Sequence, residues 1–464
     1  ANTSGTDNVA VGHAAGDAVT TGSDNTLIGD NAGGAVTTAS GHTAVGSSAL
    51  LTMSTGTTGT AVGFEALKVA TGNNNSAVGY QAGVAVSTGT ENTIVGNAAG
   101  DAVTTGADNT FVGDNAGGAV STASGHTAVG SSALLTMSTG TTGTAIGFEA
   151  LKVATGNNNT AVGYQSGVAV STGTENTLVG NASGDAVTTG ADNTLVGDNA
   201  GGAITTGGNN VAVGSGALLV ATTAADNTAV GTLALTANSS GTDNTAVGYA
   251  AGDAVTTGST NTFVGDNSGG ATTTADHNTA VGASALLVNS TGASNTAVGK
   301  SALAANTTGS YNIAVGKDAL LSNTTASYNI SIGEDSLDAN TTGTNNVAVG
   351  HQALTANTTA NNNTAVGYVS GSSNTTGAGN VSVGESSLKS NTTGDNLVAI
   401  GKNALEANTG DSNTGVGKDA GKSITSGDNN LCLGRDAGIA SSPGGAVTTG
   451  NNQICLGDEN ITHA

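Results

Sequence analysis

The stretch NTAVGKSALAANTTG, from Asn295 to Gly309, contains the unit that recurs along almost the whole chain. The glycine of its AVG triplet has equivalents from Gly12 and Gly29 onward to Gly434 and Gly457. These glycines are 17 residues apart, except for three steps of 16 residues and a last step of 23. Residues 24–107 also recur almost unchanged at 108–191, as expected of a recent duplication. The chain is therefore a tandem array of one short unit.

This unit predicts an all-β fold. Seventeen residues are too few for a helix–turn–helix repeat, and Thr, Val and Asn beside Gly favour short strands and turns. We expect each unit to form one coil with two short strands, stacked on the next coil at about 4.8 Å. The sequence predicts a parallel β-solenoid (β-roll) of about 27 coils, with 17 residues per coil. We expect the repeat shaft to span residues 1–434, and a modified last coil to span 435–464.

The composition excludes several classes of protein. The 464 residues include 75 Gly, one Pro and no Trp, so an ordinary globular core is not expected. A net charge of −23 with few large apolar residues would indicate disorder, but stacked repeats can bury a narrow continuous core. Nine Lys and Arg are too few and too scattered for nucleic-acid binding. No apolar stretch reaches the roughly 20 residues of a membrane span, and no signal peptide is recognisable.

The strand within the unit has two faces, because alternate residues of a strand point to opposite sides. We expect the residue before the glycine and the residue two positions earlier to point into the coil. The residue between them would then face outward, yet it is never charged. One interpretation is a thin chain with two dry faces, and the other is a contact with sister chains. The candidate subunit interface consists of the large members of this position, Leu27, Ile94, Phe111, Leu178, Leu195 and Phe263.

The residue after the glycine is the most variable one, and we expect it to form a ladder that faces solvent. Its aromatic members are candidates for ligand recognition, although a solvated edge without function is the simpler alternative. These candidates are Phe64, Tyr80, Tyr164, Tyr249 and Tyr368. Asn occupies most positions four residues before the glycine. We expect it to form structural amide ladders and corners.

The sequence shows no catalytic arrangement, so we do not expect an enzyme. No Cys or His spacing matches a zinc site, and no cofactor is predicted. Cys432 and Cys455 occupy equivalent positions of neighbouring units and are expected to be small buried thiols.

Two ligand-binding alternatives remain. Gly106–Gly118 (GADNTFVGDNAGG) is similar to calcium-binding rolls, but those repeat every nine residues, and Asp30, Asp114 and Asp198 lie in non-adjacent units. Thr-Thr pairs such as Thr20–Thr21 and Thr104–Thr105 would suit an ice-binding face if it were flat and exposed.

The Asn295–Gly309 run resembles the repeats of marine bacteriophage tail fibres, and it is similar to the NSVAIG repeats of trimeric autotransporter adhesin heads. Asn430–Gly438 and Ile454–Thr462 resemble the segment that precedes an endosialidase-type intramolecular chaperone domain in such fibres. The resemblance implies a homotrimeric, extracellular fibre of the virion tail. Its partners would be its own copies, other tail proteins, and a glycan or protein of the host cell surface. A bacterial trimeric surface adhesin, which would carry a membrane anchor, is the alternative.

Overall fold

The computed structural model describes residues 2–138, 140–442, 444–458 and 460. These residues form short β-strands of three residues each and no helix. The strands are β1 (Val9–Val11), β2 (Thr26–Ile28), β3 (Thr43–Val45), β4 (Thr60–Val62), β5 (Ser76–Val78), β6 (Thr93–Val95), β7 (Thr110–Val112), β8 (Thr127–Val129), β9 (Thr144–Ile146), β10 (Thr160–Val162), β11 (Thr177–Val179), β12 (Thr194–Val196), β13 (Val211–Val213), β14 (Thr228–Val230), β15 (Thr245–Val247), β16 (Thr262–Val264), β17 (Thr279–Val281), β18 (Thr296–Val298), β19 (Ile313–Val315), β20 (Ile330–Ile332), β21 (Val347–Val349), β22 (Thr364–Val366), β23 (Val381–Val383), β24 (Val398–Ile400), β25 (Thr414–Val416), β26 (Leu431–Leu433) and β27 (Ile454–Leu456).

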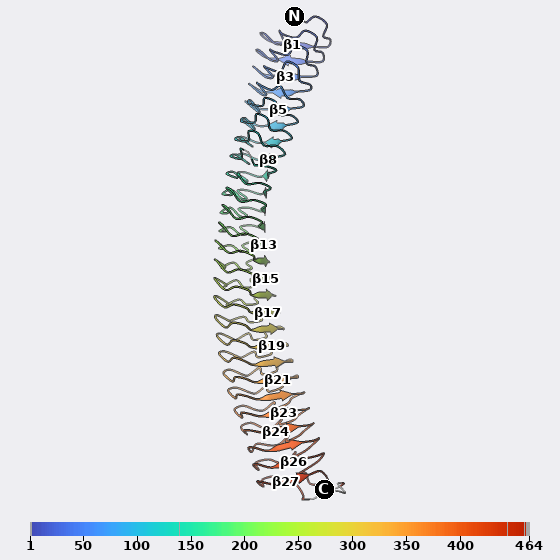
Figure 1. Ribbon diagram of the computed structural model, residues 1–464, viewed down its shortest axis with the longest axis vertical. Helices are drawn as coiled ribbons and strands as arrows, with labels where there is room; N and C mark the ends of the chain where they lie inside the picture. The colour runs from blue at the N-terminus through green and yellow to red at the C-terminus, as the bar shows by residue number, and fades with distance from the viewer. Residues whose placement is uncertain (1, 139, 443, 459, 461–464) are drawn as a thin grey trace. The chain divides into compact units, whose positions relative to one another are not determined.

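The chain divides into two compact units, residues 1–230 with β1 to β14 and residues 231–464 with β15 to β27. Within each unit every strand pairs in parallel with the next one along the chain (Figure 1). The partners are equivalent residues of successive repeats, as in the pair Thr296 and Ile313. Each unit is therefore a parallel β-solenoid with one strand per coil. This architecture confirms the predicted fold class and the 17-residue period.

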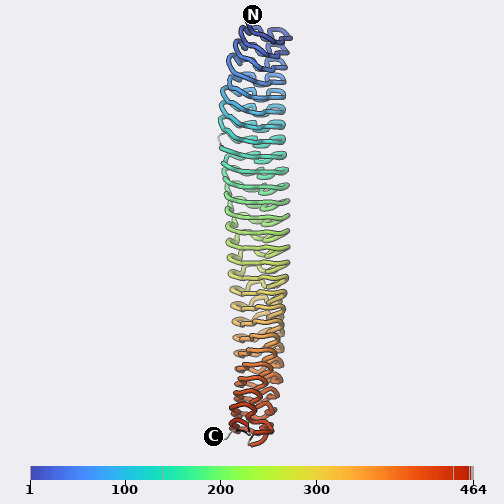
Figure 2. The backbone as a smooth tube through the Cα atoms, turned by 90° about the vertical axis from the view of Figure 1, so that its right-hand side faces the viewer, coloured from blue at the N-terminus to red at the C-terminus, as the bar shows by residue number. Residues whose placement is uncertain are grey.

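The second predicted strand of each coil is absent from the described residues, and that prediction was wrong. After the glycine, the second and fourth residues adopt left-handed conformations, as Ser301 (φ 55°) and Leu303 (φ 55°) do. Alternating left-handed residues wind the chain into consecutive turns, which cannot extend as a strand. The turns still bond from coil to coil, since the Leu303 amide donates to the Ala319 carbonyl at 2.9 Å. The coils of each unit thus stack on both sides (Figure 2).

The glycine itself is required where the strand meets the turns. Gly299 has a φ of +133°, and a Cβ at this position would lie 2.5 Å from the carbonyl oxygen of Gly316 in the next coil. Neither the backbone angle nor the spacing leaves room for a side chain. The recurring AVG triplet therefore ends each strand at the same point of the coil.

The core of each unit is a narrow column of small residues. In the coil of β18, the middle strand residue Ala297 faces Ala302 and Leu303, and all three are fully buried. Asn306 closes this core at the far corner, where its amide bonds to Asn289 and to the Gly309 carbonyl. The hydrophobic core thus runs along the coil axis and is only a few side chains wide.

A second asparagine column lies directly before the strand and confirms the predicted amide ladder. The Asn312 side chain donates to the carbonyl of Ala326 at 2.8 Å and to Oδ1 of Asn295 at 3.2 Å. Its own Oδ1 accepts the backbone amide of Asn329 from the next coil at 3.0 Å. Each buried amide therefore ties one coil to its neighbours on both sides, which satisfies polar groups that burial would otherwise leave unpaired.

Candidate functional site

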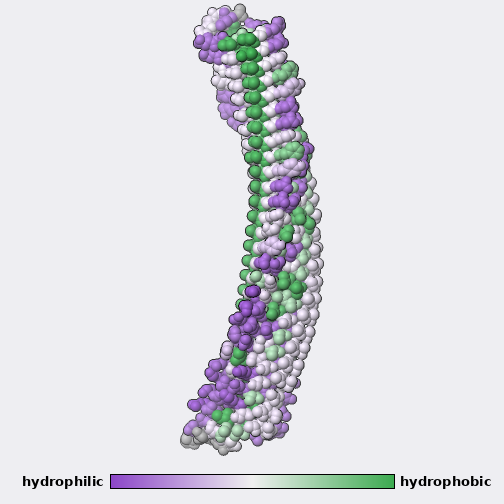
Figure 3. Space-filling model, turned by 180° about the vertical axis from the view of Figure 1, so that it is seen from behind, coloured by the Kyte–Doolittle hydropathy of each residue, from purple (hydrophilic) through white to green (hydrophobic). Residues whose placement is uncertain are grey.

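An apolar stripe covers the outer side of the strands. We define it as the last residue of each strand, and this residue is Val, Ile or Leu in every strand. In unit 1, six of its fourteen members are at least 36% exposed, among them Val11, Val78 and Ile146. In unit 2 the same holds for eight of thirteen, including Val281, Val298 and Ile332. Figure 3 shows part of the stripe as a line of apolar side chains.

The six residues predicted to form a subunit interface do not lie on the surface. Each of the six candidate residues is the middle residue of its strand and is 0–1% exposed, so these side chains lie inside their own coil. The predicted orientation of the strand was therefore inverted. These residues are Leu27, Ile94, Phe111, Leu178, Leu195 and Phe263.

The middle strand residue points inward because its size is matched by the size of one residue across the coil. A Cβ placed on Gly117 would lie 2.7 Å from the Phe111 ring, and one on Gly269 would lie 2.4 Å from the Phe263 ring. Coils with a large middle strand residue have Gly at the fourth position after the strand glycine. Coils with Leu at that fourth position, such as Leu303, have the small residue Ala or Ser in the middle of the strand. The middle residue is thus restricted by core packing and has no role at the surface.

The surface ladder of aromatic residues is exposed, as predicted. Tyr80, Tyr164, Tyr249 and Tyr368 are 51–57% exposed, and Phe64 is 43% exposed. Neighbouring coils stack some of these rings on one another. The stacked pairs are Phe64–Tyr80 (5.3 Å between centroids), Phe148–Tyr164 (5.4 Å) and His351–Tyr368 (5.6 Å).

Polar side chains border the Phe64–Tyr80 pair. Lys68 and Gln81 both bond to the Glu65 carboxylate, at 2.6 and 2.8 Å. The hydrogen bond from Lys68, and then that from Gln81, holds the pKa of Glu65 below its ordinary value. The second copy of the duplicated block repeats this arrangement around Phe148 and Tyr164.

The sequence reasoning missed one of the four stacked aromatic pairs. Tyr311 and Tyr328 stack with centroids 5.1 Å apart and planes 4° apart, and they are 55% and 59% exposed. Both have left-handed backbones, with φ values of 59° and 62°. They occupy the position five residues before the strand glycine, where most coils have Asp, Asn, Ser, Thr or Gly. Comparing that position across the repeats would have revealed both tyrosines.

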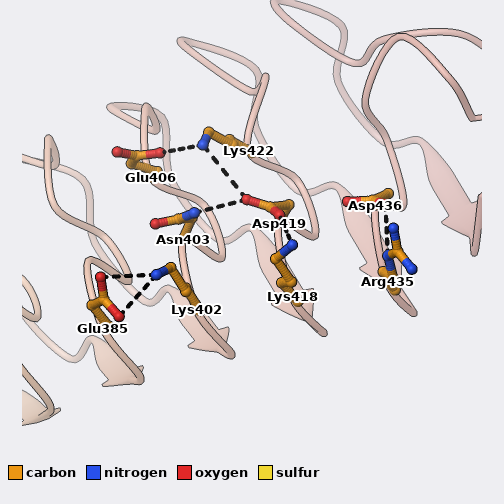
Figure 4. A network of polar contacts seen from close by, with 9 residues as sticks. All are labelled: Glu385, Lys402, Asn403, Glu406, Lys418, Asp419, Lys422, Arg435 and Asp436. Atoms are coloured by element: carbon orange, nitrogen blue, oxygen red, sulfur yellow. Dashed lines mark hydrogen bonds and ion pairs between the residues drawn. The ribbon is translucent and has the colours of Figure 1, made fainter.

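Charged residues of unit 2 form ion pairs within and between neighbouring coils (Figure 4). Lys402 binds Glu385 at 3.0 Å, and Lys422 binds Glu406 at 2.9 Å and Asp419 at 3.5 Å. The hydrogen bond that Lys422 donates to the Glu406 carboxylate raises the pKa of Lys422 above its ordinary value. The Lys402–Glu385 pair is about half exposed on both sides, so it contributes little to stability.

A metal site finds no support among the described residues. No group of three or more His, Cys, Asp or Glu side chains is placed to hold a metal ion in this part of the chain. The acidic residues considered for calcium lie next to polar partners of the preceding coil, Asp30 beside His13, Asp114 beside Asn97 and Asp198 beside Asn181.

The two cysteines face each other on the last two strands, where Cys432 and Cys455 are register partners. Cys432 is buried as expected, whereas Cys455 is half-buried. Burial and the neighbouring Cys455 raise the pKa of Cys432 to about 12, so its thiol is not a nucleophile near neutral pH.

The Thr-Thr corner offers only one exposed hydroxyl per coil. The hydroxyl of Thr20 donates to the Thr37 carbonyl, and that of Thr104 donates to Ser121. Thr21 and Thr105 are exposed. The first hydroxyl of each pair is thus engaged in stacking the coils, which does not favour the ice-binding alternative.

Among the residues described, no helix is long and apolar enough to span a membrane. No known protein-family model matches the chain, and no characterised protein sequence is similar to it.

Proposed function

We propose that this chain is the shaft of a homotrimeric fibre, and that the fibre belongs to a phage tail that attaches to the host cell surface. The observation that carries the proposal is the apolar stripe. Exposed apolar residues scattered singly are normal on a soluble protein. In each unit, however, every coil places a partly or largely exposed Val, Ile or Leu at the same position, and such a row is of the kind that marks an interface.

A second copy of the chain fits this surface better than an unrelated partner does. The stripe repeats once per coil, at about 4.8 Å along each unit. A partner that covers it throughout must present apolar groups with the same spacing, and another copy of the same stripe does so. If the two edges of the stripe contact different neighbours around one axis, the assembly closes into a ring of subunits, which gives a defined oligomer. The trimeric state and the tail location rest on the resemblance of the repeats to tail fibres.

The mass in solution tests the proposal. Each chain weighs 43.6 kDa, and we expect sedimentation equilibrium to give three times that mass. Substituting Val281, Val298 and Ile332 with Lys should weaken assembly at least about a hundredfold, because each contact loses apolar burial and gains a charge. The circular dichroism spectrum of the folded solenoid should remain.

The matched control places three lysines on the exposed corner of the same unit, as Thr291→Lys, Thr308→Lys and Thr325→Lys. This variant adds the same charge without touching the stripe, and it should assemble like the original chain. A monomeric wild-type chain, or equal weakening by both variants, would overturn the proposal.

The place of the fibre is tested separately. Immunogold labelling with an antibody against the chain should mark the tails of phage particles. Labelling of a bacterial envelope would favour the adhesin alternative.

A further inference from the structure

A periodic stripe leaves one problem unsolved for a fibre made of identical chains. Adjacent coils present nearly the same Val or Ile side chain, so a copy displaced by one coil would bury almost the same apolar area. Some feature that breaks the repeat must therefore fix the relative height of the chains. We infer that the Tyr311–Tyr328 pair is this feature, and that it anchors the contact with a second copy of the chain; the inference rests on the proposed trimeric fibre.

The two tyrosines occupy a costly backbone conformation. The left-handed region is rarely adopted by bulky side chains, and a residue held there is strained. Ser294 and Asn345, one coil before and one coil after the pair, adopt the same conformation with side chains that suit it better. Both tyrosines are more than half exposed, so burial within the chain does not offset the strain. Aromatic residues with these properties are typical of contact anchors.

The strands beside the pair begin a more apolar part of unit 2. The first strand residue is Thr in the four coils before the pair, from Thr245 to Thr296, and Ile at Ile313 and Ile330. It is again Val, Ile or Leu in five of the seven later strands. Ile332 then continues the stripe in the second coil. Ile313 and Ile332 are 39% and 41% exposed. In these coils the apolar surface thus widens from one position of the strand to two, with the tyrosine pair two residues upstream.

The exposed apolar area of unit 2 supplies a large part of what a stable contact needs. A standard interface buries about 800 Å² per partner. Full burial of a Val, Ile or Leu side chain corresponds to roughly 60–120 Å², so thirteen such residues at about one-third exposure offer on the order of 250–500 Å². Two half-exposed tyrosines add roughly 150–250 Å². The tyrosine pair therefore supplies a large share of the area, concentrated at one height.

The distribution of charge also favours a second copy as the occupant of this region. Residues 300–435 contain seven of the nine Lys and Arg and ten of the 32 acidic residues, a net charge of −3. The rest of the chain therefore carries −20 of the total of −23. Averaged over residues 300–435, repulsion between identical chains is therefore weaker than along the rest of the chain. The nearest cation, Lys317, is already paired with Asp318 and Glu334 and forms a polar rim to the contact.

Cross-linking within the stripe measures the relative height of the chains. Two versions of the full chain, Val366→Cys and Val383→Cys, place a thiol on adjacent coils in a Cys432→Ala and Cys455→Ala background. They are mixed, unfolded, refolded together and oxidised with copper phenanthroline, and mass spectrometry identifies the linked peptides. A contact with matched heights gives 366–366 and 383–383 links, whereas a displacement of one coil gives 366–383 links.

We expect links between identical positions to exceed mixed links at least tenfold in the unaltered chain. The double variant Tyr311→Ser and Tyr328→Ser should bring the two classes to similar abundance. Ser294 already adopts the same backbone angle, so the variant should stay folded. The control Tyr164→Ser and Tyr249→Ser removes two equally exposed ladder tyrosines and should keep the original pattern.

The outcomes separate the two proposals. A chain that sediments at 43.6 kDa overturns the fibre itself. An oligomer whose double variant keeps the tenfold excess leaves the fibre intact and overturns the role of Tyr311 and Tyr328. The role of the two tyrosines is also overturned if the oligomer that retains both of them gives mixed links, or gives no links between identical positions.

Discussion

At the scale of single residues, the asparagine ladder shows how one side chain can be exchanged for another of equivalent geometry. His42 stands where most coils have the buried Asn, and it makes the same contacts. Its Nε2 lies 3.1 Å from the carbonyl oxygen of Gly56, and its Nδ1 accepts the amide of Gly59 at 2.9 Å. Both bonds require the neutral ring with the proton on Nε2. His126 repeats these contacts in the second copy of the block.

Acid should therefore destabilise unit 1 through these two imidazoles. Burial lowers the pKa of His42 and of His126 below the ordinary 6.5. The unfolded chain thus binds protons more readily than the folded one, and stability falls as the pH drops below about 6.5. Each pKa unit of lowering corresponds to about 1.4 kcal/mol once the pH is below the folded value.

The double variant His42→Asn and His126→Asn should lose less stability between pH 7.5 and pH 5 in urea unfolding followed by circular dichroism. The variant His13→Asn removes an exposed imidazole of the same unit, and it should keep the acid sensitivity of the original chain. Equal acid sensitivity in all three proteins would contradict the assignment.

At the scale of one coil, the pairing of a large strand residue with a glycine is the main packing rule. Phe111 fills the space that Gly117 leaves, and Leu50 fills the equivalent space opposite Ala44. Leu50 also shows that a leucine can adopt the left-handed conformation at that position, since its φ is 49°. A coil should therefore accept either pair, a large strand residue with Gly or Ala with Leu, if both residues are changed together.

This rule predicts a rescue. Phe111→Ala should cost about 3–5 kcal/mol, because it leaves a cavity in a fully buried column. Gly117→Leu alone should also destabilise, since its Cβ would lie 2.7 Å from the ring. The double variant recreates the Ala–Leu pair and should recover at least half of the summed loss. Urea unfolding of the four proteins provides the double-mutant cycle. Simple additivity would show that the two positions do not share one space.

At the scale of the whole molecule, the net charge opposes the assembly of copies that the apolar stripe would favour. Each copy carries a net charge of −23, so bringing copies together costs repulsion that salt screens. The apolar contact itself is little affected by moderate salt. The balance between the two terms therefore depends on ionic strength.

Raising sodium chloride from 20 to 300 mM should strengthen assembly about tenfold or more, measured as the dissociation constant by sedimentation velocity. The three-lysine corner variant serves as the comparison, because it reduces the charge of each copy and should depend less on salt. Weaker assembly at high salt would mean that ion pairs between copies, rather than the stripe, hold the fibre together.

The sequence by itself determined the period, the parallel stacking and the solenoid. These follow from local chemistry that recurs every 17 residues, such as the glycine that no other residue can replace and the asparagine that bonds to the next coil. The exposed positions of Phe64 and Tyr80 also followed from the variability of their position.

Only the tertiary structure decided which face of the strand is the inner one. Alternation puts Val298 and Thr296 on one side and Ala297 on the other, but it does not say which side is buried. That choice depends on residues across the coil. In the coil of β18, the small Ala297 and the large Leu303 are both fully buried and share the core between them. The same distant packing turned Phe111 inward and left the valines outside, where a second chain can cover them.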